Sequence, residues 1–150
     1  MSLDSEVDAL RKVPIFKGIE PAKLRLLAFI SERMSYHPGE NVCVQGEAGD
    51  SAYVIMGGTA DVVVRTPQGE RPVAEVKQND FVGEIAILCD VPRTATIVAK
   101  TELNVLTISK DSFLKMLQEF PEMGLEVMRV LAQRLEKTTR DLAEVRSRLP

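Results

Sequence analysis

The chain has 150 residues, of which 45% are hydrophobic and 27% charged, with a formal net charge of −3. This length fits one domain with a hydrophobic core, and the charge gives no bulk electrostatic case for binding nucleic acid or a membrane surface. Because no apolar run approaches the length of a bilayer span and the N-terminus lacks a signal pattern, we expect a cytoplasmic protein without a membrane segment.

The cysteines and the histidine indicate no catalytic or metal chemistry. Cys43 and Cys89 do not share a metal-ligand spacing, and we expect both to be reduced and buried. His37 precedes a Pro-Gly turn and has no neighbouring Ser, Cys or His with which to form a relay. We therefore expect a protein with no metal site and no enzyme activity.

Residues 5–35 are predicted to be helical. Glu20-Pro21 is typical of a helix start within this segment. Apolar residues recur at helical spacing on both sides of it: Val7, Leu10 and Val13, then Leu24, Leu27, Ala28 and Ile30. We expect these helices to pack as the N-terminal part of one domain, residues 1–150.

Residues 36–109 are predicted to form short strands separated by turns rich in Gly, Pro, Asn and Asp. Many short strands at regular spacing favour a mainly β, antiparallel sandwich or jelly roll. A barrel of this size leaves room for one small ligand. Val62 and Val73 would then be apolar walls near a sugar or base, or alternatively ordinary core residues.

Residues 81–96 combine groups that suit a sugar phosphate. Gly83 permits close approach of a ligand to the backbone, and the short apolar run after it predicts a helix whose first N–H groups attract anions. These N–H groups, with one more further on, form the expected cradle: Ile85, Ala86 and Ala95. The fork of Arg93 matches phosphate oxygens, and Glu84 can accept from ribose hydroxyls. The alternative is an internal Glu84–Arg93 ion pair that braces a loop.

Residues 110–149 are predicted to form helices, with Pro121 starting a long final one. Its positions spaced by three and four residues form a heptad seam: Met128, Leu131, Leu135, Thr138, Leu142, Val145 and Leu149. The seam extends far past the strands, so we interpret it as a homodimer interface between parallel helices. The alternative is a helix folded back on its own roll. The hydroxyls of Thr138 and Thr139 either bond to each other or to the backbone, or contact a ligand.

The stretch 81–96 resembles the phosphate-binding cassette of the cyclic-nucleotide-binding domain family. The matching residues are Phe81, Gly83, Glu84, Ala86, Leu88, Pro92, Arg93, Thr94, Ala95 and Thr96. Further matches to the family's glycine pattern are Gly46, Gly49, Asp50, Tyr53, Ile55 and Gly58. The resemblance implies a double-stranded β-helix with flanking helices, in which Glu84 binds the ribose 2′-OH and Arg93 binds the cyclic phosphate.

The final helix resembles the dimer helix of the catabolite-activator (cAMP receptor protein) group from Pro121 to about Val145. In that group, residues matching Thr138 and Thr139 touch adenine across the dimer, and the residue matching Arg134 supports the ribose-binding Glu. The resemblance thus implies a sensor that binds cAMP and signals through this helix. Thr94 keeps cGMP open as the ligand, because a hydroxyl there can reach either the guanine amino group or the phosphate.

Catabolite activators continue into a winged-helix DNA-binding domain, whereas this sequence stops at Pro150. We therefore expect no direct nucleic-acid binding by this chain. It would be a free-standing sensor or a fragment of a cAMP-responsive transcription regulator without its DNA-binding domain. A further hypothesis is a roll that only dimerises and binds no ligand.

Overall fold

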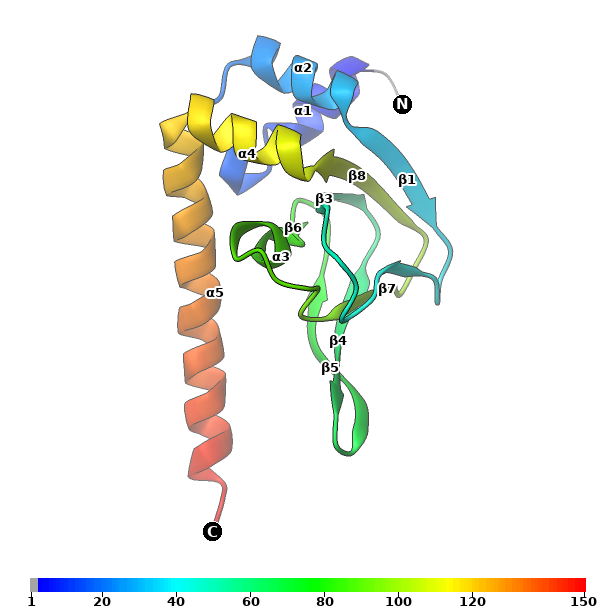
Figure 1. Ribbon diagram of the computed structural model, residues 1–150, viewed down its shortest axis with the longest axis vertical. Helices are drawn as coiled ribbons and strands as arrows, with labels where there is room; N and C mark the ends of the chain where they lie inside the picture. Colours follow the sequence, from blue (N-terminus) through cyan, green and yellow to red (C-terminus); the bar gives the residue numbers. More distant parts are fainter. Residues whose placement is uncertain (1–2) are drawn as a thin grey trace.

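The strands form a β-roll of two antiparallel sheets in the computed structural model, which describes residues 3–150 (Figure 1). Within these residues each sheet has four strands, in the orders β1-β8-β3-β6 and β2-β7-β4-β5. The strands are β1 (Glu32–Tyr36), β2 (Asn41–Cys43), β3 (Ser51–Gly57), β4 (Ala60–Thr66), β5 (Gly69–Val76), β6 (Phe81–Val82), β7 (Thr96–Ala99) and β8 (Leu103–Ser109). The predicted mainly β, antiparallel roll is confirmed.

Alternate side chains of β3 pack into two different hydrophobic clusters. Tyr53 and Ile55 face the interior of the roll, whereas Ala52 and Val54 face the helices on the outside. Successive side chains of a strand point to opposite faces, so this sheet is apolar on both. The helices must therefore cover its outer face, and Figure 1 shows α1, α2 and α4 over that end of the roll.

The N-terminal helices are α1 (Leu3–Leu10), the short 3-10 helix η1 (Pro14–Phe16) and α2 (Pro21–Ile30). The prediction of helix over residues 5–35 is wrong at its C-terminal end, where β1 pairs with β8 from the Glu32–Thr107 register onward. Backbone pairing along β8 decides the structure of this segment, because most of the side chains of β1 are exposed and carry no strand pattern.

A buried carboxylate attaches α1 to β1. Glu6 is 1% exposed, and both of its oxygens accept from the guanidinium of Arg33 on β1. An ionised carboxylate is costly to bury unless it is paired and hydrogen-bonded. The pair therefore links α1 to β1, in addition to the packing of Val7 and Leu10 in the core.

The long helix α5 (Pro121–Ser147) follows α4 (Lys110–Glu119) and runs along one side of the roll (Figure 1). It packs on the domain through the buried Met123 and Val127 near its start. Most of the heptad seam lies exposed: Met128, Leu135, Leu142, Val145 and Leu149 are all more than half accessible. The seam therefore does not fold back on its own roll, and the predicted helix ends at Ser147 rather than at 149.

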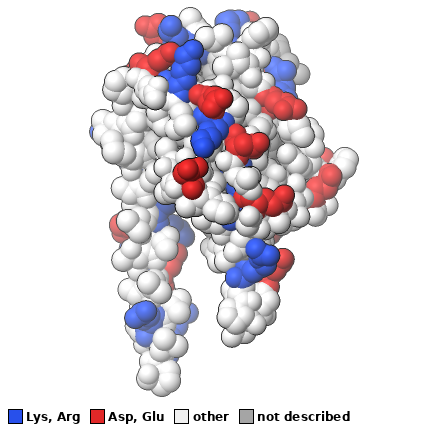
Figure 2. Space-filling view, viewed as in Figure 1, with Lys and Arg blue, Asp and Glu red and all other residues white. Residues whose placement is uncertain are grey.

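Charges of both signs are interspersed on the face shown in Figure 2, without an extended basic area. Towards the bottom of that view, the end of α5 and the β4–β5 hairpin project as two separate arms.

None of the helices within residues 3–150 is both long and apolar enough to cross a bilayer. The expected burial of both cysteines is wrong, since Cys89 is exposed and Cys43 is half-buried.

Candidate functional site

Gly83 separates β6 from the short helix α3 (Glu84–Leu88) and makes the turn between them possible. Its φ is +87°, in the left-handed region that residues with a side chain rarely adopt. A Cβ at this position would also lie 2.8 Å from Nη1 of Arg93. The next residue, Glu84, starts α3 and is only 3% exposed. The first N–H groups of α3 have no partner within the helix, as at any helix start.

A cavity of about 410 Å³ lies between the roll and α5. Its wall is built from β4, β5, the turn into α3, the segment before β7, and the middle of α5. The predicted site residues that line it are Val62, Val73, Gly83, Glu84, Ile85, Ala86, Arg93, Thr94, Ala95, Arg134 and Thr138. Thr139 is not among the lining residues and is exposed on α5. The lining runs from Cys43 to Asp141, so the fold brings segments up to 98 residues apart in the chain to one cavity.

Arg93 is fixed at both its backbone and its side chain. Its N–H donates to the carbonyl of Glu47 at 2.8 Å, and its carbonyl accepts from the N–H of Gly46 at 2.9 Å. The guanidinium is buried, with the residue 5% exposed. Nη1 donates to the Gly83 carbonyl at 3.0 Å, while Nη2 donates to the Ser51 carbonyl at 2.7 Å and to the Tyr53 hydroxyl at 3.1 Å.

The Arg93 guanidinium has no negatively charged hydrogen-bond partner among the described residues. Burial raises the pKa of the Tyr53 phenol and of the Cys43 thiol, although Arg93 opposes part of each shift. Both groups therefore stay neutral at pH 7. A buried cation without a counter-charge is unfavourable, so this position favours an anion in the cavity.

Two of the five N–H groups of Arg93, on Nε and Nη1, have no acceptor within residues 3–150. Glycines stand beside both nitrogens. A Cβ on Gly49 would lie 3.1 Å from Nε, and one on Gly83 would lie 2.8 Å from Nη1. The absence of side chains at Gly49 and Gly83 therefore lets their backbones pack closely against these two nitrogens.

Glu84 pairs with Arg134 of α5, not with Arg93. Nη1 of Arg134 donates to Oε1 of Glu84 at 2.6 Å, and Nη2 of the same arginine donates to the Phe81 carbonyl. The alternative of an internal Glu84–Arg93 ion pair is therefore wrong for the described structure. The carboxylate remains in the cavity wall with further capacity to accept hydrogen bonds.

The cavity lining combines apolar and polar side chains. Val62 is half-buried, whereas Val73 is 61% exposed yet lines the cavity, so the alternative that Val73 is an ordinary core residue is wrong. Sequence reasoning missed several further lining residues, among them Cys43, Ile97, Lys137 and Asp141. The last two could have been found, because they follow Arg134 at helical spacing on the face that also carries Thr138.

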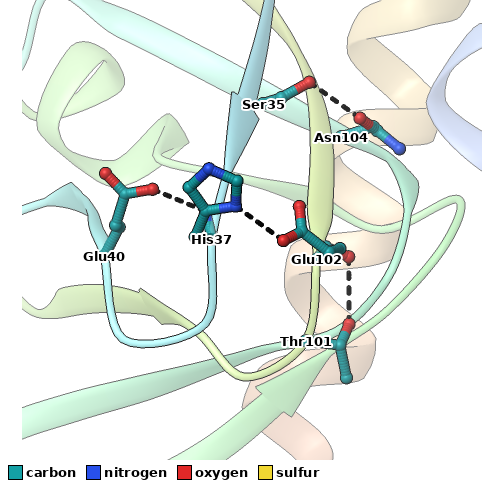
Figure 3. Close-up of polar contacts among 6 residues, drawn as sticks. All are labelled: Ser35, His37, Glu40, Thr101, Glu102 and Asn104. Carbon is teal, nitrogen blue, oxygen red and sulfur yellow. Dashed lines mark hydrogen bonds and ion pairs between the residues drawn. The ribbon is translucent and has the colours of Figure 1, made fainter.

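His37 forms a separate polar cluster at the turn between β1 and β2, which Figure 3 shows. Its Nδ1 lies 2.6 Å from Oε1 of Glu102, and its backbone N–H donates to Glu40 at 2.6 Å. The hydroxyl of Ser35 points instead to Asn104, which accepts from it at 2.9 Å. This histidine therefore lacks a hydroxyl partner in the part of the chain that the structure describes. Within residues 3–150, no group of three or more His, Cys, Asp or Glu side chains is placed to hold a metal ion.

Comparison with known proteins identifies the family of this fold and cavity. Residues 33–120, more than half of the chain, match the family model described as cyclic nucleotide-binding domain. A cAMP-dependent protein kinase regulatory subunit of Yarrowia lipolytica is 40% identical over 108 residues, which are 72% of this chain and 28% of that protein.

Two further similarities extend over α5. A CRP-like cAMP-activated global transcriptional regulator of Mycobacterium tuberculosis is 29% identical over 139 residues, which are 92% of this chain and 62% of that protein. The catabolite activator protein of Thermus thermophilus has the same fold, with a TM-score of 0.78 and 24% identity over 88% of this chain and 62% of that one. The chain thus spans less than two thirds of each of these relatives.

Proposed function

Because the chain belongs to the cyclic nucleotide-binding domain family, we propose that it is a regulatory domain that binds cAMP, in preference to cGMP, in the cavity beside α5. One observation carries this proposal. The guanidinium of Arg93 is buried, faces the cavity with two spare donors, and has no carboxylate partner within the described residues. An arginine fork in a site shielded from water is the protein group best matched to a phosphate.

The roles of the remaining cavity residues follow from their positions. Arg93 binds the cyclic phosphate together with the N–H groups of Ile85, Ala86 and Ala95. Glu84 accepts from the ribose 2′-OH, and Arg134 holds its carboxylate in place. Val62, Val73, Thr94 and Thr138 surround the base, while Thr139 would reach a base only from a second copy of the chain. Thr138 lines the cavity and Thr139 does not, which supports these different roles for the two threonines.

Preference for cAMP over cGMP is proposed on two grounds. The relatives at 40% and 29% identity are named for cAMP. Thr138, which lines the cavity, also matches the catabolite-activator pattern of the dimer helix. A cavity of about 410 Å³ lies within the usual range for small-molecule sites, about 300–1,000 Å³.

We further propose that the exposed seam of α5 forms a parallel homodimer and that the position of this helix is the output. Support comes from the exposure of Leu135, Leu142 and Val145 on one face of a helix that projects past the roll. A contiguous apolar face of this kind marks an interaction surface. The expected location is the cytoplasm, and the expected activity is binding rather than catalysis, in line with the regulatory relatives.

Titration calorimetry with cAMP and with cGMP tests the proposal. We expect tight binding of cAMP and weaker binding of cGMP. Arg93→Lys keeps the charge but removes the fork, and it should weaken binding by about tenfold or more, since hydrogen bonds to charged groups contribute about 1.5–3 kcal/mol each. The matched control is Arg71→Lys on the exposed β5, outside the cavity.

Absence of binding of both nucleotides to the folded wild-type protein would overturn the proposal. Binding that is unchanged in Arg93→Lys would overturn the assigned phosphate site while leaving nucleotide binding intact. A stronger response to cGMP would overturn only the proposed base preference.

A further inference from the structure

Tyr53 supplies one of three oxygen partners of the Arg93 guanidinium, and it does so from a side chain rather than from the backbone. Its hydroxyl accepts from Nη2 at 3.1 Å, and Cζ of Arg93 lies 5.1 Å from the centre of its ring. The other two partners are the carbonyls of Gly83 and Ser51. Both hydrogens of Nη2 are therefore used within the protein, one by Ser51 and one by Tyr53.

The spare donors of the guanidinium belong to its two other nitrogens. Nε and the second N–H of Nη1 have no acceptor within residues 3–150, and these are the nitrogens beside Gly49 and Gly83. The guanidinium is thus held through both Nη1 and Nη2, and it keeps one free N–H on Nε and one on Nη1. Because the group is planar, fixing the Nη2 corner determines where the other donors point.

Tyr53 is well placed to act as an anchor. The residue is 7% exposed, and its ring packs in the core between the two sheets with Ile55, Val82 and Leu103. Buried aromatic rings in a packed core have little freedom to move. Its own O–H hydrogen has no acceptor that the structure describes, so the hydroxyl serves Arg93 as an acceptor.

We propose that Tyr53 is a positioning residue of the anion site: its hydroxyl holds the Nη2 corner of Arg93 so that Nε and Nη1 present their free N–H groups to the ligand phosphate. This inference rests on the function proposed above. Without the hydroxyl, one Nη2 hydrogen is buried without an acceptor, which favours rotation of the guanidinium away from this orientation. Restoring the orientation on binding then reduces the affinity.

The test compares Tyr53→Phe with Tyr36→Phe. Tyr36 packs against the same core, but it does not line the cavity and is not among the hydrogen-bond partners of the Arg93 guanidinium within residues 3–150. Calorimetry with cAMP and cGMP should show binding to Tyr53→Phe that is about three- to tenfold weaker than to the wild type, the range for loss of one hydrogen bond. Tyr36→Phe should bind within about twofold of the wild type. Thermal melting of both variants checks that they fold.

A second readout separates positioning from a general structural effect. In ¹H–¹⁵N spectra of the free protein, the Nε–H signal of Arg93, assigned by its loss in Arg93→Lys, should shift in Tyr53→Phe and stay in place in Tyr36→Phe. In a double-mutant cycle, Tyr53→Phe should cause no further loss in the Arg93→Lys background, because Tyr53 acts through the fork.

Three outcomes overturn the inference: unchanged affinity in Tyr53→Phe, an unmoved Nε–H signal, or an equal loss in the Arg93→Lys background. Each of them can occur while the wild type binds nucleotide normally. Failure of the wild type to bind either nucleotide would instead overturn the proposed function, and this inference with it.

Discussion

The side chains of Glu84 and Arg134 connect the cavity wall to the long helix, 50 residues apart in the sequence and 2.6 Å apart in space. Glu84 is almost fully buried at the start of α3, whereas Arg134 is partly exposed at the middle of α5. The same guanidinium also donates to the carbonyl of Phe81 on β6. One arginine thus attaches α5 to both β6 and α3, the two elements that the turn at Gly83 connects.

Replacing Arg134 with Gln should loosen α5 and weaken nucleotide binding. The buried carboxylate of Glu84 would lose its cationic partner, and an unsatisfied buried group costs about 1–3 kcal/mol. We expect about tenfold weaker binding by calorimetry and faster hydrogen exchange in the middle of α5. Arg129→Gln is the control, since its ion pair with Glu126 lies on the same helix outside the cavity. Equal nucleotide affinities and equal hydrogen-exchange rates in the two variants would contradict the role proposed for the Glu84–Arg134 pair.

Gly83→Ala should destabilise the fold and impair binding. A non-glycine residue in the left-handed region costs about 1–2 kcal/mol, and the new Cβ would collide with Nη1 of Arg93. Gly124 in α5 has open space around it, so Gly124→Ala should instead raise stability by about 0.5–1 kcal/mol. Urea unfolding measures the stability of both variants, and calorimetry measures their nucleotide binding. If Gly83→Ala were as stable as the wild type and bound nucleotide as tightly, the turn would tolerate a side chain.

Leu142→Glu should convert a dimer into a monomer. Leu142 is 53% exposed in the seam of α5, where a parallel partner would place an identical leucine opposite it. Gln133→Glu adds the same charge outside the seam, on an exposed position of the same helix, and should leave the dimer intact. Light scattering after size-exclusion chromatography gives the mass of each variant. A wild-type protein that is monomeric with and without nucleotide would refute the proposed interface.

Arg33→Met should destabilise the protein more than Glu6→Met. Loss of Arg33 leaves the carboxylate of Glu6 buried without its partner, whereas loss of Glu6 leaves Arg33 at a position where its side chain is 55% exposed and can be hydrated. The midpoint of urea unfolding should therefore fall further for the arginine variant. The reverse order would mean that the ion pair itself does not determine how α1 is held.

The pKa of His37 should lie above its ordinary value, mainly because of the hydrogen bond to Glu102 (Figure 3). Since folding raises this pKa, protonated His37 stabilises the fold at acidic pH, and this contribution is lost as the pH rises through the raised pKa. The imidazole signals in an NMR titration give the value directly. Glu102→Gln should lower it towards normal, whereas Glu75→Gln, whose carboxylate pairs with Lys100, should not.

Features that depend on neighbours in the sequence could be predicted well. The cavity residues between Gly83 and Ala95 lie within one segment whose glycine, carboxylate and arginine suit a sugar phosphate. The roles of Arg134 and Thr138 were expected from the resemblance of the long helix to the dimer helix of the catabolite-activator group. The antiparallel roll followed from regular turns between short strands, because period-two alternation and turn residues are local signals.

Features that depend on tertiary pairing could not be predicted. The strand β1 has mostly exposed side chains, and it is a strand because β8 lies beside it. The Glu84–Arg134 pair depends on where α5 docks, so it was expected only through the family resemblance and not from any spacing in the sequence. Contact between Tyr53 and Arg93 joins β3 to the segment before β7, and no periodicity in the sequence indicates it. Thr139 matches a family position, yet it is exposed and does not line the cavity of its own chain.

The Glu84–Arg134 pair has a thermodynamic consequence for a chain that both binds a nucleotide and pairs through α5. A ligand that bonds to Glu84 alters the group that holds α5, so the two equilibria share one free energy of coupling. Linkage requires this effect to be reciprocal. If nucleotide tightens the dimer by some factor, the dimer must bind nucleotide more tightly by the same factor. The apparent affinity would then rise with the concentration of the protein itself.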